Sequence, residues 1–252
     1  MSKVQDDEFK MPDVTNLKVA DENNTSVNTS VNTNRQQVIL FCIPGKTFSN
    51  RFVVLWSELL LQCLLNGYRP VLCQENDKNI YISRNKCLGA NLLSNDEDQK
   101  PFQGKIEYDY LVWLDPNVVF TFNEIKKVLE SPYDVTTGLY LLTGDTTNVV
   151  KNMSHEFYLK NGTFDFVQYE NILDFEKEDN RYFQVDFTDL GFACFKKGVI
   201  EKLKYPWFTE TTKEPVALFT DSYTFCQKLK DNGVKIYADA NTKMKYIDSG
   251  FY

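Results

Sequence analysis

Short apolar runs alternate with amphipathic segments from residue 37 to about residue 145, a pattern typical of strands followed by helices. The run QVILFCIP ends at Pro44, and RPVLCQE, YDYLVWLD and YDVTTGLYLL follow as further strands. Apolar residues recur at helical spacing over 50–66, and Gly67 is a suitable helix terminus. Because parallel strands need crossover helices, this alternation predicts an α/β fold with a mostly parallel central sheet flanked by helices.

The remaining pattern predicts shorter elements. SRNKCLGANLL is expected to be a helix entered at Ser83, and FNEIKKVLESP a short helix capped by Asn123, with the polar SNDEDQKPFQGK between them as a surface loop. After about residue 145 the alternation loosens, and FDFVQYE indicates antiparallel additions in the C-terminal half. VDFTDLGFACFKKGVIEKL then predicts a strand and a helix, and SYTFCQKLKDNG a helix ending at Gly233 before the strand VKIYAD.

Residues 1–36 differ in composition from the rest of the chain. They contain one aromatic residue and end in the polar tract NNTSVNTSVNTNRQQ, which cannot bury enough apolar surface to order itself. We therefore expect a disordered tail over residues 1–36 and a single folded domain over residues 37–252.

Charge and cysteine content exclude several classes of protein. The 252 residues are 42% hydrophobic and carry a formal net charge of −7 with lysines scattered among the acids, so a nucleic-acid partner is not expected. Six cysteines without a CxxC pair and a single histidine argue against a zinc site and fit reduced, buried thiols. Residues 1–10 are not a signal peptide, and residues 52–65 are too short and polar to span a membrane, so a cytoplasmic protein is expected.

The apolar run LVWLDPNVVF, residues 111–120, is interrupted by Asp115 and Asn117. Ligands of open parallel sheets bind beyond the carboxyl ends of the strands, which is where this acidic tip would lie. Asp-Pro-Asn is also a good turn sequence, so a purely structural role stays open at this point. A phosphate loop at GKT, residues 45–47, is rejected because Leu40 stands where that motif needs glycine.

Four segments in this order resemble GT-A-fold glycosyltransferases, particularly the small viral and phage-type enzymes. YLVWLDPNVVFTFNEIKKVLESPYDVTTGLYLL resembles their Asp-x-Asp strand, short helix and next strand, and SRNKCL resembles the entry to an earlier helix. DLGFACFKKGVIEKL is similar to their Gly-Phe segment, and DSYTFCQKLKDNGVKIYAD to their last helix–strand module. The resemblance covers residues 38–247, nearly all of the chain expected to fold.

This resemblance implies transfer of a sugar from a nucleotide-sugar donor to a hydroxyl of a glycan or other acceptor, with inversion expected. A divalent cation, Mg²⁺ or Mn²⁺, or a fixed Lys or Arg would offset the charge that develops on the leaving diphosphate. The family pattern assigns metal binding to Asp115 and Asn117. It assigns donor binding to the same two residues and to Pro44, Arg84 and Gly191. From its own position, Arg84 could equally be a solvated arginine at a helix start.

An inverting enzyme needs a carboxylate to take the proton of the acceptor hydroxyl. The alignment on the family's last module places Asp221 opposite the family's Glu and Ser222 opposite its Asp, so the base is Asp221 only if the helix start slips by one residue. An ordinary helix N-cap is the structural alternative for Asp221. Asp189 is a second catalytic carboxylate that could reach the acceptor.

Three further features depart from the family or stay open. Tyr246 stands where the family often has a metal-binding histidine, and Asn117 replaces an acid, so the metal shell is weaker than the family's. Either Asp115 and the diphosphate hold the metal, or Lys243 or Lys245 supplies positive charge instead. Among the aromatics, Trp113 is expected in the core, Trp207 exposed near the acceptor, and Tyr140 is a stacking candidate.

Two other functions compete with this interpretation. The departures at Asn117, Ser222 and Tyr246 are compatible with a non-catalytic relative that binds nucleotide or glycan. A nucleotidyltransferase shares strand-end acids on a similar sheet, but it would need two or three metal-binding carboxylates close together, and the strand tip carries one.

Overall fold

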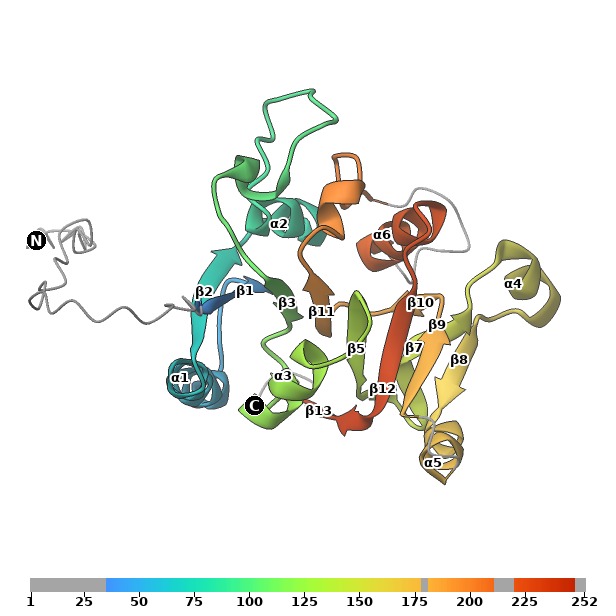
Figure 1. The fold of residues 1–252 in the computed structure, drawn as a ribbon. Coiled ribbons are helices and arrows are strands. Elements are labelled where there is room, and N and C mark those ends of the chain that lie inside the picture. The colour runs from blue at the N-terminus through green and yellow to red at the C-terminus, as the bar shows by residue number, and fades with distance from the viewer. Residues whose placement is uncertain (1–34, 178–180, 211–219, 248–252) are drawn as a thin grey trace, which may run out of the picture. The chain divides into compact units, whose positions relative to one another are not determined.

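A seven-stranded sheet forms the centre of the protein (Figure 1). The computed structural model describes residues 35–177, 181–210 and 220–247, and the expected N-terminal tail lies almost entirely outside these ranges. The chain divides into residues 1–35 and residues 36–252, and the fold described here is that of the second unit. The strand order is β2-β1-β3-β11-β5-β12-β9, with bounds β2 Tyr68–Glu75, β1 Gln37–Pro44, β3 Tyr110–Leu114, β11 Phe192–Lys196, β5 Val135–Leu139, β12 Ile236–Lys243 and β9 Tyr182–Val185.

Five of these strands run in one direction. β1 is parallel to both β2 and β3, and β12 is parallel to β5, whereas β11 is antiparallel to β3 and β5 and β9 is antiparallel to β12. Pro70 is tolerated in β2 because β2 is an edge strand, where one side of the backbone needs no ladder partner. The expected mixed α/β class with a largely parallel sheet is confirmed.

Both faces of the sheet are buried, which explains why β1 and β3 are continuous apolar runs rather than alternating ones. Ile39, Phe41 and Ile43 of β1 pack in one core with helices α1 (Asn50–Leu65) and α3 (Phe122–Leu129). Leu40 and Cys42 pack in the other core, together with α2 (Ile80–Cys87) and α6 (Thr220–Asp231). Side chains of successive strand residues point to opposite faces, so one strand supplies both cores.

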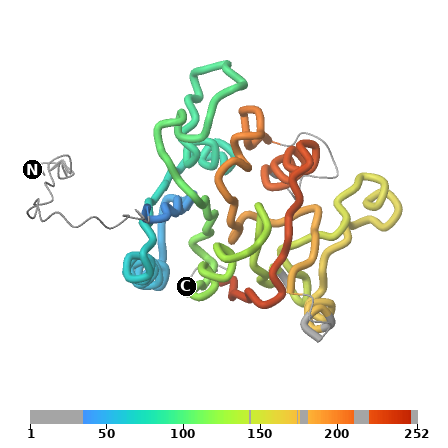
Figure 2. The backbone as a smooth tube through the Cα atoms, viewed as in Figure 1, coloured from blue at the N-terminus to red at the C-terminus, as the bar shows by residue number. Residues whose placement is uncertain are grey.

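Most of the chain between β5 and β11 builds a second sheet beside the central one. β6 (Leu141–Thr143), β7 (Thr146–Asn152), β8 (Asp165–Gln168) and β10 (Phe187–Thr188) pair antiparallel, with α4 (His155–Asn161) and α5 (Tyr169–Lys177) inserted in the same region (yellow in Figure 2). The expected antiparallel additions are therefore present. A third, two-stranded sheet pairs β4 (Val118–Val119), just beyond the acidic tip, with β13 (Lys245–Tyr246).

Three local predictions need correction, and α1 exposes one of the apolar residues that recur at helical spacing. The helix expected from Ser83 begins at Ile80, and the helix expected to be capped by Asn123 is capped by Thr121, which forms a capping box with Glu124. The helix expected after FACFKK is only a 3₁₀ turn, Ile200–Lys202. On α1, Leu64 is 57% exposed rather than buried, because Phe52, Leu59 and Cys63 form the inward face.

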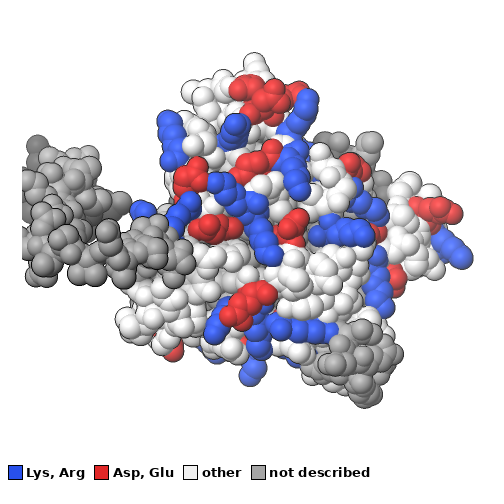
Figure 3. Space-filling view, viewed as in Figure 1, with Lys and Arg blue, Asp and Glu red and all other residues white. Residues whose placement is uncertain are grey.

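The described surface carries mixed charge. In Figure 3, Lys and Arg are interspersed with Asp and Glu over the visible face, so that face shows no separate basic area of the kind that binds nucleic acid. Within the ranges described above, no helix is long and apolar enough to cross a membrane. All six cysteines are free thiols, and Cys73 is the only one of them that is not fully buried.

Candidate functional site

Asp115 lies directly beyond β3, and the backbone there turns sharply. The Asp115 carboxylate accepts the Asn117 backbone N–H at 2.7 Å, and the Asp115 carbonyl accepts the Val118 N–H at 3.0 Å. The turn therefore uses one carboxylate oxygen, as Asp-Pro-Asn predicted. Pro44, at the end of the parallel neighbour β1, reaches the same edge of the sheet because Cys42 pairs with Trp113.

Gly191 lies opposite Asp115 and carries a structural constraint. The Asp115 N–H donates to the Gly191 carbonyl at 2.8 Å, immediately before β11 pairs with β3. The Gly191 N–H donates to the Tyr140 hydroxyl at 3.1 Å, and a Cβ on residue 191 would lie 2.1 Å from that oxygen. Only glycine leaves room for the Tyr140 hydroxyl here.

Tyr140 connects this backbone to Asp189. Its hydroxyl donates to Asp189 Oδ2 at 3.0 Å, while Ser222 Oγ donates to Asp189 Oδ1 at 3.3 Å. Both oxygens of the half-buried Asp189 carboxylate are thus held by neutral hydroxyl groups. Burial, followed by the Asp189 charge, raises the pKa of Tyr140 well above its ordinary value, so Tyr140 stays a proton donor to Asp189.

Arg84 joins the same group from α2. Its Nη1 donates to Asp221 Oδ2 at 2.8 Å and to Ser222 Oγ at 2.7 Å, and the side chains of Arg84 and Asp221 are 9% and 2% exposed. The Arg84 Cζ lies 6.0 Å from the Trp113 ring and 5.8 Å from the Phe208 ring, so a buried cation is held between aromatic faces and a carboxylate. Ser222 therefore accepts a hydrogen bond from Arg84 and donates one to Asp189, which connects the Arg84–Asp221 ion pair to Asp189.

The electrostatic environment links Asp115 to this network. Burial raises the pKa of Asp115 above its ordinary value, and the nearby Asp189 charge adds to the rise. The Asn117 N–H and the Arg84 guanidinium act in the opposite direction and lower the pKa. The Asp189 charge, which follows β10, is therefore near enough to act on the Asp115 carboxylate, which follows β3.

Asp115 fits a cation that arrives with its ligand. Among the residues that the structure describes, no group of three His, Cys, Asp or Glu side chains could hold a metal ion by themselves. Mg²⁺ in nucleotide sites commonly uses one or two carboxylates and completes its shell with phosphate oxygens and water. Asp115 could supply one such carboxylate, and a cation beside it would offset the negative charge that raises its pKa.

Tyr246 lies beside the strand tip, where the family alignment placed it. Its ring stacks on Tyr140 with centroids 5.5 Å apart and planes 14° apart, and the Ile247 N–H donates to the Asn117 carbonyl at 2.9 Å. Tyr246 thus packs against the tyrosine that holds Asp189. Lys243 and Lys245 are exposed on the same segment.

Two aromatic predictions are resolved by burial. Trp113 is fully buried, as expected, but Trp207 is also 0% exposed and packs against Tyr205 in the core, so its predicted exposure near an acceptor is wrong. The sequence could not show this, because WF at 207–208 has no periodicity and Phe208 stacks on the distant Phe225.

The structure brings Arg84, Asp115, Asp189, Gly191 and Asp221 into one network at the carboxyl edge of the sheet. Their roles in binding and catalysis stay predictions. The sequence did not indicate that the hydroxyl groups of Tyr140 and Ser222 would hold Asp189. Tyr140 was predicted only as a stacking residue, and Ser222 only as the residue that replaces an acid. The glycine in DLGF was the available signal, since it marks a close approach.

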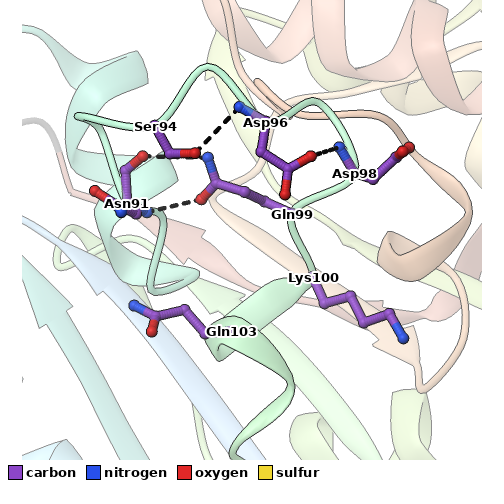
Figure 4. Close-up of a pocket in the computed structure, with 7 residues that line it drawn as sticks. All are labelled: Asn91, Ser94, Asp96, Asp98, Gln99, Lys100 and Gln103. Carbon is purple, nitrogen blue, oxygen red and sulfur yellow. Dashed lines mark hydrogen bonds between the residues drawn. The ribbon is translucent and has the colours of Figure 1, made fainter.

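A hollow of about 330 Å³ elsewhere on the surface has a simpler explanation. It lies in the polar loop that follows α2 and is lined by Asn91, Ser94, Asp96, Asp98, Gln99, Lys100 and Gln103 (Figure 4). Its polar groups largely bond each other, for example Gln99 with the Asn91 backbone and Ser94 with the Asp96 N–H. The loop's own turns account for these residues.

Comparisons with known proteins concern the fold. No family model and no curated protein matches the chain. Protein A197 from STIV is 17% identical over 86% of this chain and 96% of that one, with a TM-score of 0.49. A Drosophila β1,4-galactosyltransferase 7 mutant, solved with manganese, UDP-Gal and xylobiose, is 9% identical over 84% and 71% of the two chains, with a TM-score of 0.45. An inositol-1-phosphate CTP transferase from T. maritima is 14% identical over 85% and 90%, with a TM-score of 0.36.

The structures to which the chain shows some similarity thus include a galactosyltransferase and a CTP transferase. All three TM-scores are below 0.5, so these similarities carry no argument about function. The chemistry of the site therefore has to follow from its own residues.

Proposed function

We propose that this protein is a glycosyltransferase that moves a sugar from a nucleotide-sugar donor to an acceptor hydroxyl with inversion. The observation that carries the proposal is the pairing of Asp115 and Asp189 at the carboxyl edge of a largely parallel sheet. A buried carboxyl group whose pKa is raised, as that of Asp115 is, is found more often in catalytic sites than in purely structural positions.

Asp115 serves the donor side of this reaction. As the bond between the anomeric carbon and the diphosphate breaks, negative charge develops on the leaving nucleoside diphosphate. Mg²⁺ or Mn²⁺ held by Asp115 and the diphosphate would offset that charge when bound. Pro44 and Gly191 border the same edge, and the Gly191 carbonyl holds the Asp115 backbone in place.

Asp189 is the better of the two catalytic carboxylates. It is half-buried and bonded only by neutral hydroxyl groups, whereas Asp221 is 2% exposed and ion-paired with Arg84. We assign to Asp189 the removal of the acceptor's proton while the acceptor oxygen attacks the anomeric carbon and the diphosphate leaves. Asp221 holds Arg84, and Arg84 orients Ser222 toward Asp189.

The test measures nucleoside diphosphate release from a panel of nucleotide sugars, with Mn²⁺, with Mg²⁺ and with EDTA. Release is expected from at least one donor and is expected to fall in EDTA. Asp189→Asn should lower kcat by about 10²- to 10⁴-fold, the usual contribution of a general base, while donor affinity measured by calorimetry stays unchanged.

Asp98→Asn is the matched control, because Asp98 is an exposed carboxylate of the polar loop in Figure 4. Its kcat should equal that of the unmodified protein. Nucleotide binding without release from any donor would reject the enzyme and favour a binding protein. Pyrophosphate release from a nucleoside triphosphate and a sugar phosphate would instead favour a nucleotidyltransferase.

A further inference from the structure

A cavity of about 340 Å³ lies next to the Asp189 network and is not used by the donor chemistry. Its volume is in the range of small-molecule sites, about 300–1,000 Å³. The lining comes from the ends of β5 and β12, from β7, from the first turns of α5 and from β13, and includes Leu139, Tyr140, Tyr169, Ile172, Met244 and Lys245.

The cavity opens at the same edge of the sheet as Asp115. β5 and β12 run parallel to β3 and end at Leu139 and Lys243, which are register partners. β5 is two strands away from β3, so the two places are separated by about 10 Å at the usual strand spacing. That separation suits two substrates that meet end to end.

Tyr140 is shared by the cavity and the catalytic group. Its ring lines the cavity, and its hydroxyl donates to Asp189 Oδ2 at 3.0 Å. A molecule in the cavity would therefore be separated by one side chain, that of Tyr140, from the carboxylate that we assign as the base. The cavity is in the position of an acceptor subsite.

The lining also indicates what the acceptor carries. Lys243 Nζ lies 5.5 Å from the centroid of the Tyr169 ring, which is 38% exposed and available for stacking on a sugar face. Lys245 is exposed and makes no ion pair within the ranges that the structure describes. Among the lining residues that the structure describes there is no carboxylate, and the Lys245 ammonium stands beside an aromatic and apolar wall.

We propose that this cavity binds an acceptor saccharide bearing an anionic group, a carboxylate or a phosphate, with Lys245 as the recognition residue and Tyr169 as the stacking surface. The inference rests on the proposed glycosyl transfer for its role as acceptor, but the binding itself is independent of turnover.

Calorimetry on the full-length protein without nucleotide tests the binding. The probes are a glucuronate-terminated disaccharide, its glucose-terminated counterpart, and glucose 6-phosphate against glucose. The acidic member of each pair should bind at least about ten-fold more tightly, a difference equivalent to about 1.4 kcal/mol. Comparison of the two acidic probes decides between carboxylate and phosphate.

Three variants separate charge from stacking. Lys245→Gln should remove most of the preference for the acidic probe, Tyr169→Ala should weaken acidic and neutral probes alike, and Lys160→Gln, an exposed lysine on α4, should change neither. Equal affinity for acidic and neutral probes, or an unchanged preference in Lys245→Gln, would overturn the inference. Diphosphate release without acid preference leaves the proposed function standing alone, whereas acid preference without release from any donor leaves only the subsite.

Discussion

At the scale of single residues, several side chains of the site limit which residue types fit at neighbouring positions. Residue 191 has to be glycine because the Tyr140 hydroxyl occupies the space that a Cβ would need. The same hydroxyl donates a hydrogen bond to Asp189. Tyr140 is itself fixed by the Tyr246 ring stacked on it. Residue 246 therefore contributes to the site by packing.

Asp115 is expected to reduce stability while it serves function. Its folded-state pKa is raised, first by burial, so folding favours the protonated form. That contribution to stability is present below the unfolded-state pKa of about 4 and is lost as pH rises through the folded-state value. At neutral pH the ionised carboxylate therefore destabilises the fold.

Asp115→Asn removes this charge and keeps an oxygen for the Asn117 N–H. We expect the variant to be more stable than the unmodified protein at pH 7 and to lose that advantage as pH falls below about 4, the ordinary carboxyl value. Urea denaturation at several pH values measures the difference, and diphosphate release should be abolished. A variant less stable at pH 7 would contradict the electrostatic assignment.

At the scale of elements, one ion pair ties α2 to α6 across the sheet's edge. Arg84 and Asp221 are 137 residues apart in the chain, and both are buried. The Arg84 Nε is buried without a hydrogen-bond partner, so the pair is held at a cost in desolvation. Its retention makes sense if the orientation of Ser222 and Asp189 depends on it.

Arg84→Met should destabilise the fold by about 3–5 kcal/mol, because Asp221 stays buried without this cation. Adding Asp221→Asn should recover a large part of the loss, since the uncompensated charge is then gone. Chemical denaturation of the single and double variants measures the coupling.

Lys86→Met is the control on the same helix. The Lys86–Asp77 pair is exposed to solvent, so its loss should destabilise the fold far less than loss of the Arg84 cation. Similar losses in the free energy of unfolding for Arg84→Met and Lys86→Met would show that the buried pair stabilises the fold no more than the exposed pair does.

At the scale of the whole molecule, both cores in the described part of the chain begin within the first strand. β1 begins at Gln37, and the first member of either core is Val38. Everything that surrounds the site in the described structure belongs to the unit 36–252.

Deleting residues 1–34 should therefore change the free energy of unfolding by no more than about 0.5 kcal/mol, the usual range for changes away from core features. The truncated chain keeps the Gln36 side chain, which donates to the Tyr68 carbonyl. Urea denaturation and diphosphate release compare it with the full-length protein. A loss of several kcal/mol would mean that the first residues are part of the folded domain.

The elements that followed from the sequence are those with strong local patterns. α1 was expected over 50–66 and spans Asn50–Leu65, and the β3 run ends at the acidic tip as expected. Helix starts were less well predicted, because Thr121 with Glu124 caps α3 more effectively than Asn123 and no such box marks the start of α2. A cap depends on backbone geometry that composition alone does not reveal.

For this protein, the sequence by itself determined the α/β class, the position of Asp115 at a strand end and the set of polar residues worth considering, because periodicity and turn chemistry act between near neighbours. Only the tertiary structure decided that Arg84 pairs with Asp221, that Asp189 rather than Asp221 is the accessible carboxylate, and that Trp207 is in the core. Each of these depends on which distant segments share the low-dielectric interior. Tertiary packing across the whole sheet determines which distant segments meet, and local sequence patterns carry no information about it.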